Sequence, residues 1–211
     1  MVSCQFAFHY CFESLPQAEC MLRNISECLK PGGYFIGTTP DAYDIVNRGR
    51  TATDAATGRF GNSVYSIALP AEYRDPEAKI PLFGAQYDFH LEGVVDCPEF
   101  LVHFPTLGKL AEKFGLMLIA KRRFGNYFQQ MKDRDPELLA RMNALETFPA
   151  FDGVKLTGEA TKGNYAHGKE FCRKLREESG RDRYDRIGTL SQEEWEAATL
   201  YVIFAFKKMN L

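Results

Sequence analysis

The first stretch of the chain, residues 3–10, is almost entirely apolar or aromatic. Short apolar runs of this kind are typical of strands that are buried on both faces, as in a parallel sheet. Alternation along such a strand places Gln5 and His9 on one face and Phe6 and Tyr10 on the other. Buried polar groups cost free energy unless they are paired. The sequence therefore predicts a candidate site at the carboxyl end of this strand, where ligands of open α/β sheets bind.

A helix and a second strand are predicted next. Ser14 and Gln17 have the spacing of a capping box, and a Lys-Pro-Gly-Gly turn at residues 30–33 ends the helix. Residues 34–39 are typical of a second buried strand. The apolar stripe of the helix consists of Ala18, Leu22, Ile25 and Leu29. Strand, helix and strand together have the length of one right-handed crossover unit.

The middle of the chain is less regular. We expect a short helix at residues 41–47 and a mobile, glycine-rich loop at residues 49–61. Residues 83–91 alternate between apolar and polar side chains, which indicates a half-exposed strand with Tyr87 and Phe89 on the same face. A helix around Leu107 and a strand at 116–120 are expected to follow.

The last part of the chain is predicted to hold three helices and a strand. Asp135 and Pro136 are expected to open a helix whose inward residues are Leu138, Leu139 and Met142. A second helix is expected at residues 165–178, and Ser191 and Glu194 form a capping box before a third, which carries Trp195. Residues 199–206 are typical of an apolar final strand. The order of elements predicts an α/β fold with a helical insertion before the last strand.

Composition narrows the classes of function. With 211 residues and 45% hydrophobic residues, the chain suits one globular domain with a substantial core. A net charge of -2 gives no global basic field for nucleic acid, so an RNA contact would have to be a local patch. The six cysteines have no metal-ligand spacing, which favours a reducing compartment and no metal site. We also expect no membrane contact, because no leader or bilayer-length apolar run is found.

Several blocks in this order resemble the eukaryotic mRNA cap (guanine-N7) methyltransferases. They are residues 3–10 (SCQFAFHY), 29–40 (LKPGGYFIGTTP), 87–89 (YDF), 91–102 (LEGVVDCPEFLV), 190–196 (LSQEEWE) and 201–206 (YVIFAF). Together they extend over nearly the whole chain, whereas the Lys-Pro-Gly-Gly turn alone is common in many methyltransferases.

The resemblance implies a class I, Rossmann-like methyltransferase fold. It also implies a nuclear enzyme that transfers a methyl group from S-adenosylmethionine to the terminal guanine of capped mRNA. The residues at the family's cofactor-contacting positions are Gln5 and Tyr10. The residues at its guanine-lining positions are Phe6, His9, Tyr87, Glu99 and Tyr201.

The resemblance also implies that part of the family's fold is missing here. The family's glycine-rich cofactor loop and first three strands lie upstream of the strand at residues 3–10, and no G-x-G-x-x-G occurs in this sequence. We therefore expect residues 1–211 to be the carboxyl-terminal part of one cap methyltransferase domain, with half of the cofactor pocket absent. The expected division is 1–48 (strand, helix and strand of the core), 49–84 (mobile insertion), 85–125 (pocket strand, helix and core strand), 126–190 (helical insertion) and 191–211 (last helix and strand). In some family members the insertion binds an activating subunit, which makes 126–190 the expected place for one.

The chemistry that this family performs needs positioning more than proton transfer. Guanine N7 carries a free lone pair, so no general base is assigned. A carboxylate at Glu99 accepts both donors of guanine's Watson–Crick edge, and adenine has no such pair of donors. Aromatic side chains at Phe6, Tyr87 and Tyr201 are suited to stacking on the base.

Each of these residues also has an ordinary structural interpretation. Glu99 follows a proline near an expected helix start, where an acidic residue is favoured anyway. His9 is expected by default to be a satisfied structural histidine, and Tyr87 and Tyr201 to be packing aromatics. Arg122 and Arg123 are most simply a solvated basic face.

Two further hypotheses stay open. The chain is either catalytically inactive, with at most cap or protein binding, or it is a class I methyltransferase that acts on a small molecule. Exposure of the strand at residues 3–10 as a bare sheet edge would also make the chain poorly soluble.

Overall fold

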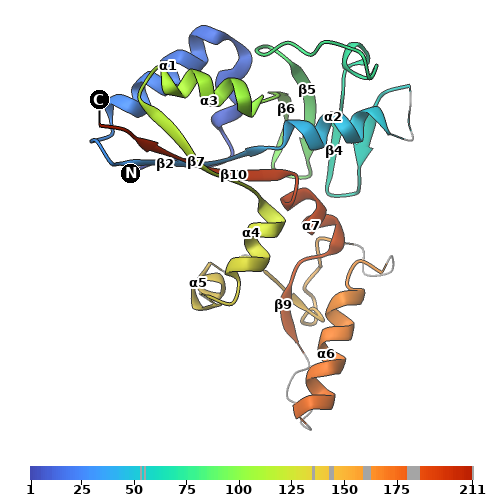
Figure 1. Cartoon of the computed structure of the whole chain (residues 1–211). Coiled ribbons are helices and arrows are strands. Elements are labelled where there is room, and N and C mark those ends of the chain that lie inside the picture. Colours follow the sequence, from blue (N-terminus) through green and yellow to red (C-terminus); the bar gives the residue numbers. More distant parts are fainter. Residues whose placement is uncertain are drawn as a thin grey trace.

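A mixed four-stranded sheet forms the centre of the molecule. The computed structural model describes residues 1–52, 54, 56–134, 136–142, 145–158, 163–179 and 186–210. The strands of the central sheet, in spatial order, are β1 (Val2–Cys4), β2 (Tyr34–Pro40), β10 (Tyr201–Lys208) and β7 (Leu116–Arg123). β1 and β2 are parallel, while β10 runs antiparallel to both of its neighbours (Figure 1). The predicted α/β class is confirmed, and the predicted crossover from the first strand to the second is present.

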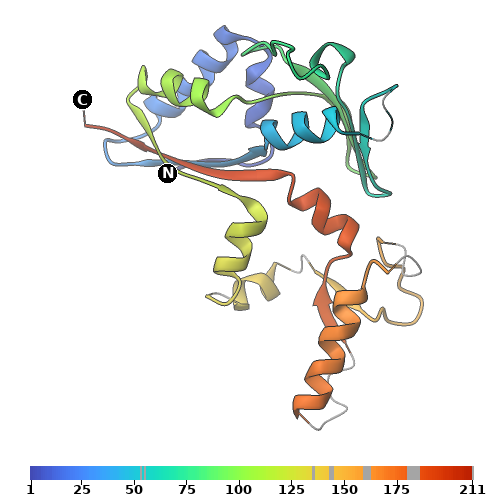
Figure 2. The ribbon, with the colours of Figure 1, turned by 45° about the vertical axis from the view of Figure 1, so that its right-hand side comes forward.

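One face of this sheet is covered by two helices and a short 3₁₀ helix. They are α1 (Leu15–Glu27), α3 (Phe104–Glu112) and η1 (Phe8–Glu13). Figure 2 shows α1 and α3 on the same side of the sheet. The predicted apolar stripe of α1 is buried, and the hydroxyl of Ser14 accepts the backbone N–H of Gln17 at the start of that helix. The core between the layers is rich in aromatic rings and includes Phe8, Phe35, Phe104, Phe204 and Phe206.

The first strand is shorter than predicted. It ends at Cys4, because Phe6 takes a positive φ of 56° and turns the chain away from the sheet. The backbone N–H of Phe6 donates to Thr38 Oγ1 at 2.9 Å, and η1 begins two residues later. The prediction of a strand over residues 3–10 is therefore wrong. Gln5 is exposed and His9 is buried, so they do not share a face of a strand.

A second, antiparallel sheet packs beside the first. Its strands, in spatial order, are β3 (Arg59–Gly61), β4 (Tyr65–Ala68), β5 (Gln86–Leu91) and β6 (Val95–Phe100). α2 (Ala42–Arg50) and η2 (Ala71–Tyr73) belong to the same part of the chain. The predicted alternation in residues 83–91 is confirmed, since Tyr87 and Phe89 are both buried.

Two expectations for this region are corrected by the second sheet. The expected loop at residues 49–61 overlaps the end of α2 and contains β3, because β4 supplies its hydrogen-bonding partner. Glu99 lies in β6 and not near a helix start, since α3 begins only at Phe104.

The insertion projects from the opposite side of the central sheet to α1 and α3 (Figure 1). Its elements, with the last helix, are α4 (Phe124–Met131), α5 (Pro136–Arg141), β8 (Glu146–Phe148), α6 (Ala166–Ser179), β9 (Ile187–Thr189) and α7 (Gln192–Ala198). The predicted helix at residues 165–178 and the capping box of Ser191 and Glu194 are confirmed.

The predicted inward face of α5 is wrong. Leu138 and Met142 are 51% and 64% exposed, because apolar spacing in so short a helix does not determine which face is covered. Asp135 and the side chain of Leu139 lie outside the described residues. In the part of the chain that the structure describes, no helix has both the length and the apolar character needed to cross a bilayer.

Candidate functional site

A buried carboxylate, Glu99, is surrounded by hydrogen-bond donors near the end of β1. Glu99 and Tyr87 are directly opposed on β6 and β5, and the Tyr87 hydroxyl donates to Glu99 Oε2 at 2.5 Å. The hydroxyl of Tyr10 reaches Oε1 at 3.5 Å, and Nε2 of His9 lies 3.1 Å from the same oxygen. Glu99 is only 2% exposed, so the two tyrosine hydroxyls replace part of the water that its carboxylate has lost.

The contact between His9 and Glu99 does not have the geometry of a hydrogen bond. Both ring nitrogens of His9 lack a hydrogen bond of good geometry within the described residues, although Nε2 is close to Glu99. The ring also packs on Tyr10, with 4.3 Å between the ring centroids. His9 therefore helps to enclose the carboxylate by packing against it and against Tyr10.

The tyrosine hydroxyls around Glu99 are held in their protonated form. Burial, followed by the nearby charge of Glu99, raises the pKa of Tyr87 well above its ordinary value. Burial also raises the pKa of Tyr10, together with contacts to Cys97 and Glu99. Because each hydroxyl keeps its proton, each can go on donating to the carboxylate at neutral pH.

Two aromatic rings extend the site toward solvent. Phe6 and Tyr201 meet edge to face, with 4.9 Å between ring centroids and 82° between ring planes. Phe6 is 53% exposed. The pKa of Tyr201 is raised by burial and by the charge of Glu99, so Tyr201 is within electrostatic reach of the carboxylate. Tyr201 thus connects the buried carboxylate with the exposed ring of Phe6.

The structure brings together six of the seven predicted site residues. We call them the Glu99 cluster, which consists of Phe6, His9, Tyr10, Tyr87, Glu99 and Tyr201. Tyr87 is only 1% exposed, and it contacts Glu99 through its hydroxyl. Gln5 is not joined to the cluster by any described contact, and its amide donates to Ser3 Oγ at 2.9 Å.

Two further residues at the site were not predicted. Cys97 Sγ lies 3.4 Å from the Tyr10 hydroxyl, and Thr38 holds the backbone of Phe6. Alternation along residues 95–100 would have identified Cys97, because it points to the same side of β6 as Glu99. The sequence around Thr38 contains no comparable signal, since the contact depends on the unusual conformation of Phe6.

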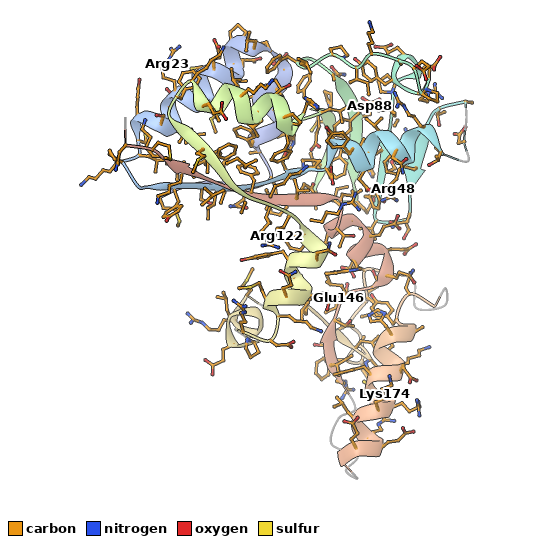
Figure 3. The ribbon with its side chains drawn as sticks, in the orientation of Figure 1. Arg23, Arg48, Asp88, Arg122, Glu146 and Lys174 are labelled. Carbon is orange, nitrogen blue, oxygen red and sulfur yellow. The ribbon has the colours of Figure 1, made fainter. Side chains whose placement is uncertain are left out.

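Two cavities lie elsewhere on the molecule. One, of about 640 Å³, lies between α2, α4 and α7, and the other, of about 460 Å³, lies between α2 and the segment after η2. Neither cavity is lined by a predicted site residue. Figure 3 shows Arg48 where α2 approaches α7, and its side chain lines the first cavity. Among the described residues, no group of His, Cys, Asp and Glu has an arrangement suited to a metal ion.

The two arginines at the end of β7 are both exposed, as expected for a solvated basic face, and Arg123 also forms ion pairs. Arg123 Nε lies 3.4 Å from Asp41, and its Nη2 lies 3.8 Å from Asp44. Arg122 is exposed at the point where β7 passes into α4 (Figure 3). Arg123 thus connects β7 with the start of α2.

Comparison with known proteins gives a consistent result. Residues 1–209 match the mRNA (guanine-N(7))-methyltransferase domain. The mRNA cap guanine-N(7) methyltransferase of Drosophila melanogaster is 53% identical over 208 residues, which are 99% of this chain and 44% of that protein. The Caenorhabditis elegans protein of the same name is 38% identical over 99% of this chain and 52% of its own length. The Oryza sativa subsp. japonica protein "mRNA cap guanine-N(7) methyltransferase 1" is 37% identical over 98% of this chain and 46% of its own length.

The chain thus spans about half the length of the curated relatives that it matches. The match extends through every element of the central sheet and through the insertion. The chain belongs to the mRNA (guanine-N(7))-methyltransferase domain family.

Proposed function

We propose that the protein that carries this chain methylates N7 of the terminal guanine of capped mRNA in the nucleus. The observation that supports this most strongly is the buried carboxylate of Glu99, which Tyr87 and His9 enclose. Tyr201 lies within electrostatic reach of this carboxylate, and its ring meets the exposed ring of Phe6. An acceptor of this kind beside a stacking surface suits a purine that presents two adjacent donors.

Glu99 reads the base. Guanine offers N1–H and N2–H on one edge, and a carboxylate accepts both. Hydrogen bonds to a charged group contribute about 1.5–3 kcal/mol each. Adenine would leave the buried carboxylate without these donors, so the site discriminates between the two purines.

Phe6 and Tyr201 stack on the base. Stacking of a base on an aromatic ring contributes about 1–3 kcal/mol. The faces of these rings also favour the positive charge that the purine acquires on methylation. Tyr87 contributes differently, because its buried hydroxyl holds Glu99 in place.

Catalysis proceeds by orientation without a general base. N7 of guanine carries no proton that must be removed. His9, which lies next to Glu99, is therefore not needed as a base. Holding the reacting atoms in line lowers a barrier by about 7–11 kcal/mol. S-adenosylmethionine supplies the methyl group when it is bound. The exposed amide of Gln5 and the hydroxyl of Tyr10 fit one side of such a cofactor, because both lie just beyond β1.

We also propose a role for each segment of the chain. The segments 1–48, 85–125 and 191–211 supply the core and the Glu99 cluster, and 49–84 adds the strands β3 and β4. The insertion 126–190 is proposed as the surface for an activating subunit, because it exposes several large apolar side chains. They are Leu138, Met142, Phe151, Val154 and Phe171.

A second candidate function is cap binding by this chain without methyl transfer. It is favoured by the small number of cofactor positions in these residues, Gln5 and Tyr10. Calorimetric titration with S-adenosylmethionine separates the two. Micromolar binding by the chain supports transfer, and an absence of heat supports binding alone.

Substitution of Glu99 tests the primary proposal. Glu99→Gln should weaken binding of the cap analogue GpppG to the chain by about tenfold or more, because the neutral amide replaces an acceptor by a donor. Glu92→Gln is the matched control, since Glu92 is exposed in the turn after β5. Equal GpppG affinities for the Glu99 variant and the unsubstituted chain would contradict the proposal.

A further inference from the structure

A polar cluster ties α7 to α2 and β4 beside the larger cavity. The carboxylate of Glu196 forms an ion pair with Arg48 and accepts the Tyr65 hydroxyl at 3.0 Å and the Asn62 amide at 3.0 Å. Arg48 also donates to the Tyr65 hydroxyl at 2.6 Å. We call these four residues, Arg48, Asn62, Tyr65 and Glu196, the Glu196 cluster.

Residues of the Glu196 cluster also make contacts outside the cluster. The guanidinium of Arg48 lies over the ring of Phe60, with 4.6 Å from its carbon to the ring centroid. The amide of Asn62 also donates to the backbone oxygen of Glu193, at 3.2 Å. Tyr65 is buried in the core of the second sheet. Polar networks of this kind fix one geometry more than they add stability.

Only a short path separates Glu196 from the Glu99 cluster. The hydroxyl of Thr199 donates to the backbone oxygens of Trp195 and Glu196, which ends α7. The next residue, Leu200, accepts the backbone N–H of Asp41 at 2.8 Å, so the start of α2 holds the chain there. Tyr201 follows immediately as the first residue of β10.

The segment from α7 to β10 is therefore held at two points, one on each side of Thr199. Arg48 of α2 contacts Glu196 of α7, and the N-cap residue of α2, Asp41, contacts Leu200. Only Ala197 to Leu200 separate Glu196 from Tyr201 along the chain, so the position of α7 at Glu196 bears on where β10 begins. The Tyr201 ring in turn rests edge-on against Phe6.

We propose that Glu196 is a positioning residue that sets the ring of Tyr201 for stacking on the guanine. This inference rests on the proposed function of the Glu99 cluster. The Glu196 cluster therefore contributes to cap affinity only through Tyr201. It does not contribute to recognition of the guanine edge.

A double-mutant cycle on GpppG binding tests the inference. Calorimetry on the full chain should show that Glu196→Gln weakens GpppG binding by about five- to tenfold. In a Tyr201→Leu background, Glu196→Gln should have no further effect, because the ring through which it acts is absent. Tyr65→Phe, which removes a single hydroxyl from the Glu196 cluster, should give a smaller loss that also vanishes in the Tyr201→Leu background.

Glu170→Gln is the matched control, since it removes an exposed ion pair with Arg173 on α6. It should leave GpppG binding unchanged. An unchanged affinity for Glu196→Gln, or equal losses with and without Tyr201, would overturn the inference and leave the proposed function standing.

Amide hydrogen exchange separates a failure of the inference from a failure of the proposed function. If the unsubstituted chain does not bind GpppG, the proposed function of the chain fails. The exchange rates at residues 200–206 then test separately whether Glu196 positions Tyr201. Faster exchange there in Glu196→Gln than in Glu170→Gln supports positioning of Tyr201 by Glu196, and equal exchange overturns it.

Discussion

At the scale of single residues, the site depends on how Glu99 is held. A buried carboxylate without partners would be strongly unfavourable. Here Tyr87 donates to one oxygen, while Tyr10 and His9 approach the other. The two tyrosine hydroxyls restrict the orientation of the carboxylate in the absence of a ligand.

Removal of the Tyr87 hydroxyl tests this arrangement. Tyr87→Phe should weaken GpppG binding by about tenfold, because Glu99 loses a hydrogen bond of 2.5 Å and gains freedom to rotate. Calorimetric titration measures the change. Tyr34→Phe is the control, since Tyr34 is exposed at the far end of β2. Equal affinities for the two variants would show that Tyr87 is only a packing residue.

Most residues of the site are predictable from the sequence, whereas their backbone conformations are not. Glu99, His9 and Tyr201 were predicted from blocks that resemble a family, and the structure brings them together. The exposure of Gln5 was not predictable, because it follows from the positive φ of Phe6 and the hydrogen bond to Thr38. Alternation assumes a regular strand, and one left-handed residue is enough to end it.

At the scale of elements, the centre of β2 is the tightest point of the central sheet. A Cβ on Gly37 would lie 2.5 Å from the backbone oxygen of Cys4 and 2.5 Å from the ring of Phe204. Both neighbours are fixed, one by strand pairing and the other by a buried aromatic cluster. Glycine is therefore required where β1, β2 and β10 meet.

Alanine at Gly37 is expected to destabilise the protein by about 1–3 kcal/mol, the usual cost of overpacking a core. Denaturant unfolding measures the effect. Gly108→Ala provides the opposite control, because a Cβ there meets nothing within 4 Å and Gly108 lies within α3. It should stabilise the protein by about 0.5–1 kcal/mol. Similar stabilities for the two variants would contradict this description of β2.

A helix or strand is predictable from the sequence when the residues that determine it lie within the element itself. α1 and α7 were predicted because their caps and apolar spacing lie within the helix itself. The second sheet was not predicted as a unit, because β3 and β4 are short and obtain their register from β5. Residues 49–61 were expected to be a loop for the same reason.

At the scale of the whole molecule, one edge of the central sheet is accessible. Among the described strands, β1 pairs with β2 alone, and its other edge has no strand beside it. Edge strands of this kind promote association between molecules. The expectation of poor solubility thus remains a prediction for the chain studied on its own.

A lysine on β1 should reduce this association. Ser3→Lys places a charge on the exposed strand, which disfavours pairing with a second edge. Light scattering at increasing protein concentration measures the effect. Gln130→Lys adds the same charge on α4, away from the edge, and should leave scattering unchanged. A monodisperse preparation of the unsubstituted chain would contradict the prediction.

Residues from both sheets form the predicted cap site. Phe6 and His9 follow β1, Tyr87 and Glu99 come from the second sheet, and Tyr201 begins the strand after the insertion. No single segment of the chain contains the site. Its formation therefore depends on the packing of both cores, and the site is a property of the assembled fold.

In the proposed cap site, the Glu99 carboxylate accepts both donors of guanine. Proton NMR of GpppG bound to the chain measures this contact directly through the guanine imino proton. We expect a slowly exchanging, downfield imino signal with the unsubstituted chain and the loss of this signal with Glu99→Gln. Saturating GpppG binding without a protected imino proton, or a signal that is unchanged in Glu99→Gln, would contradict the proposal.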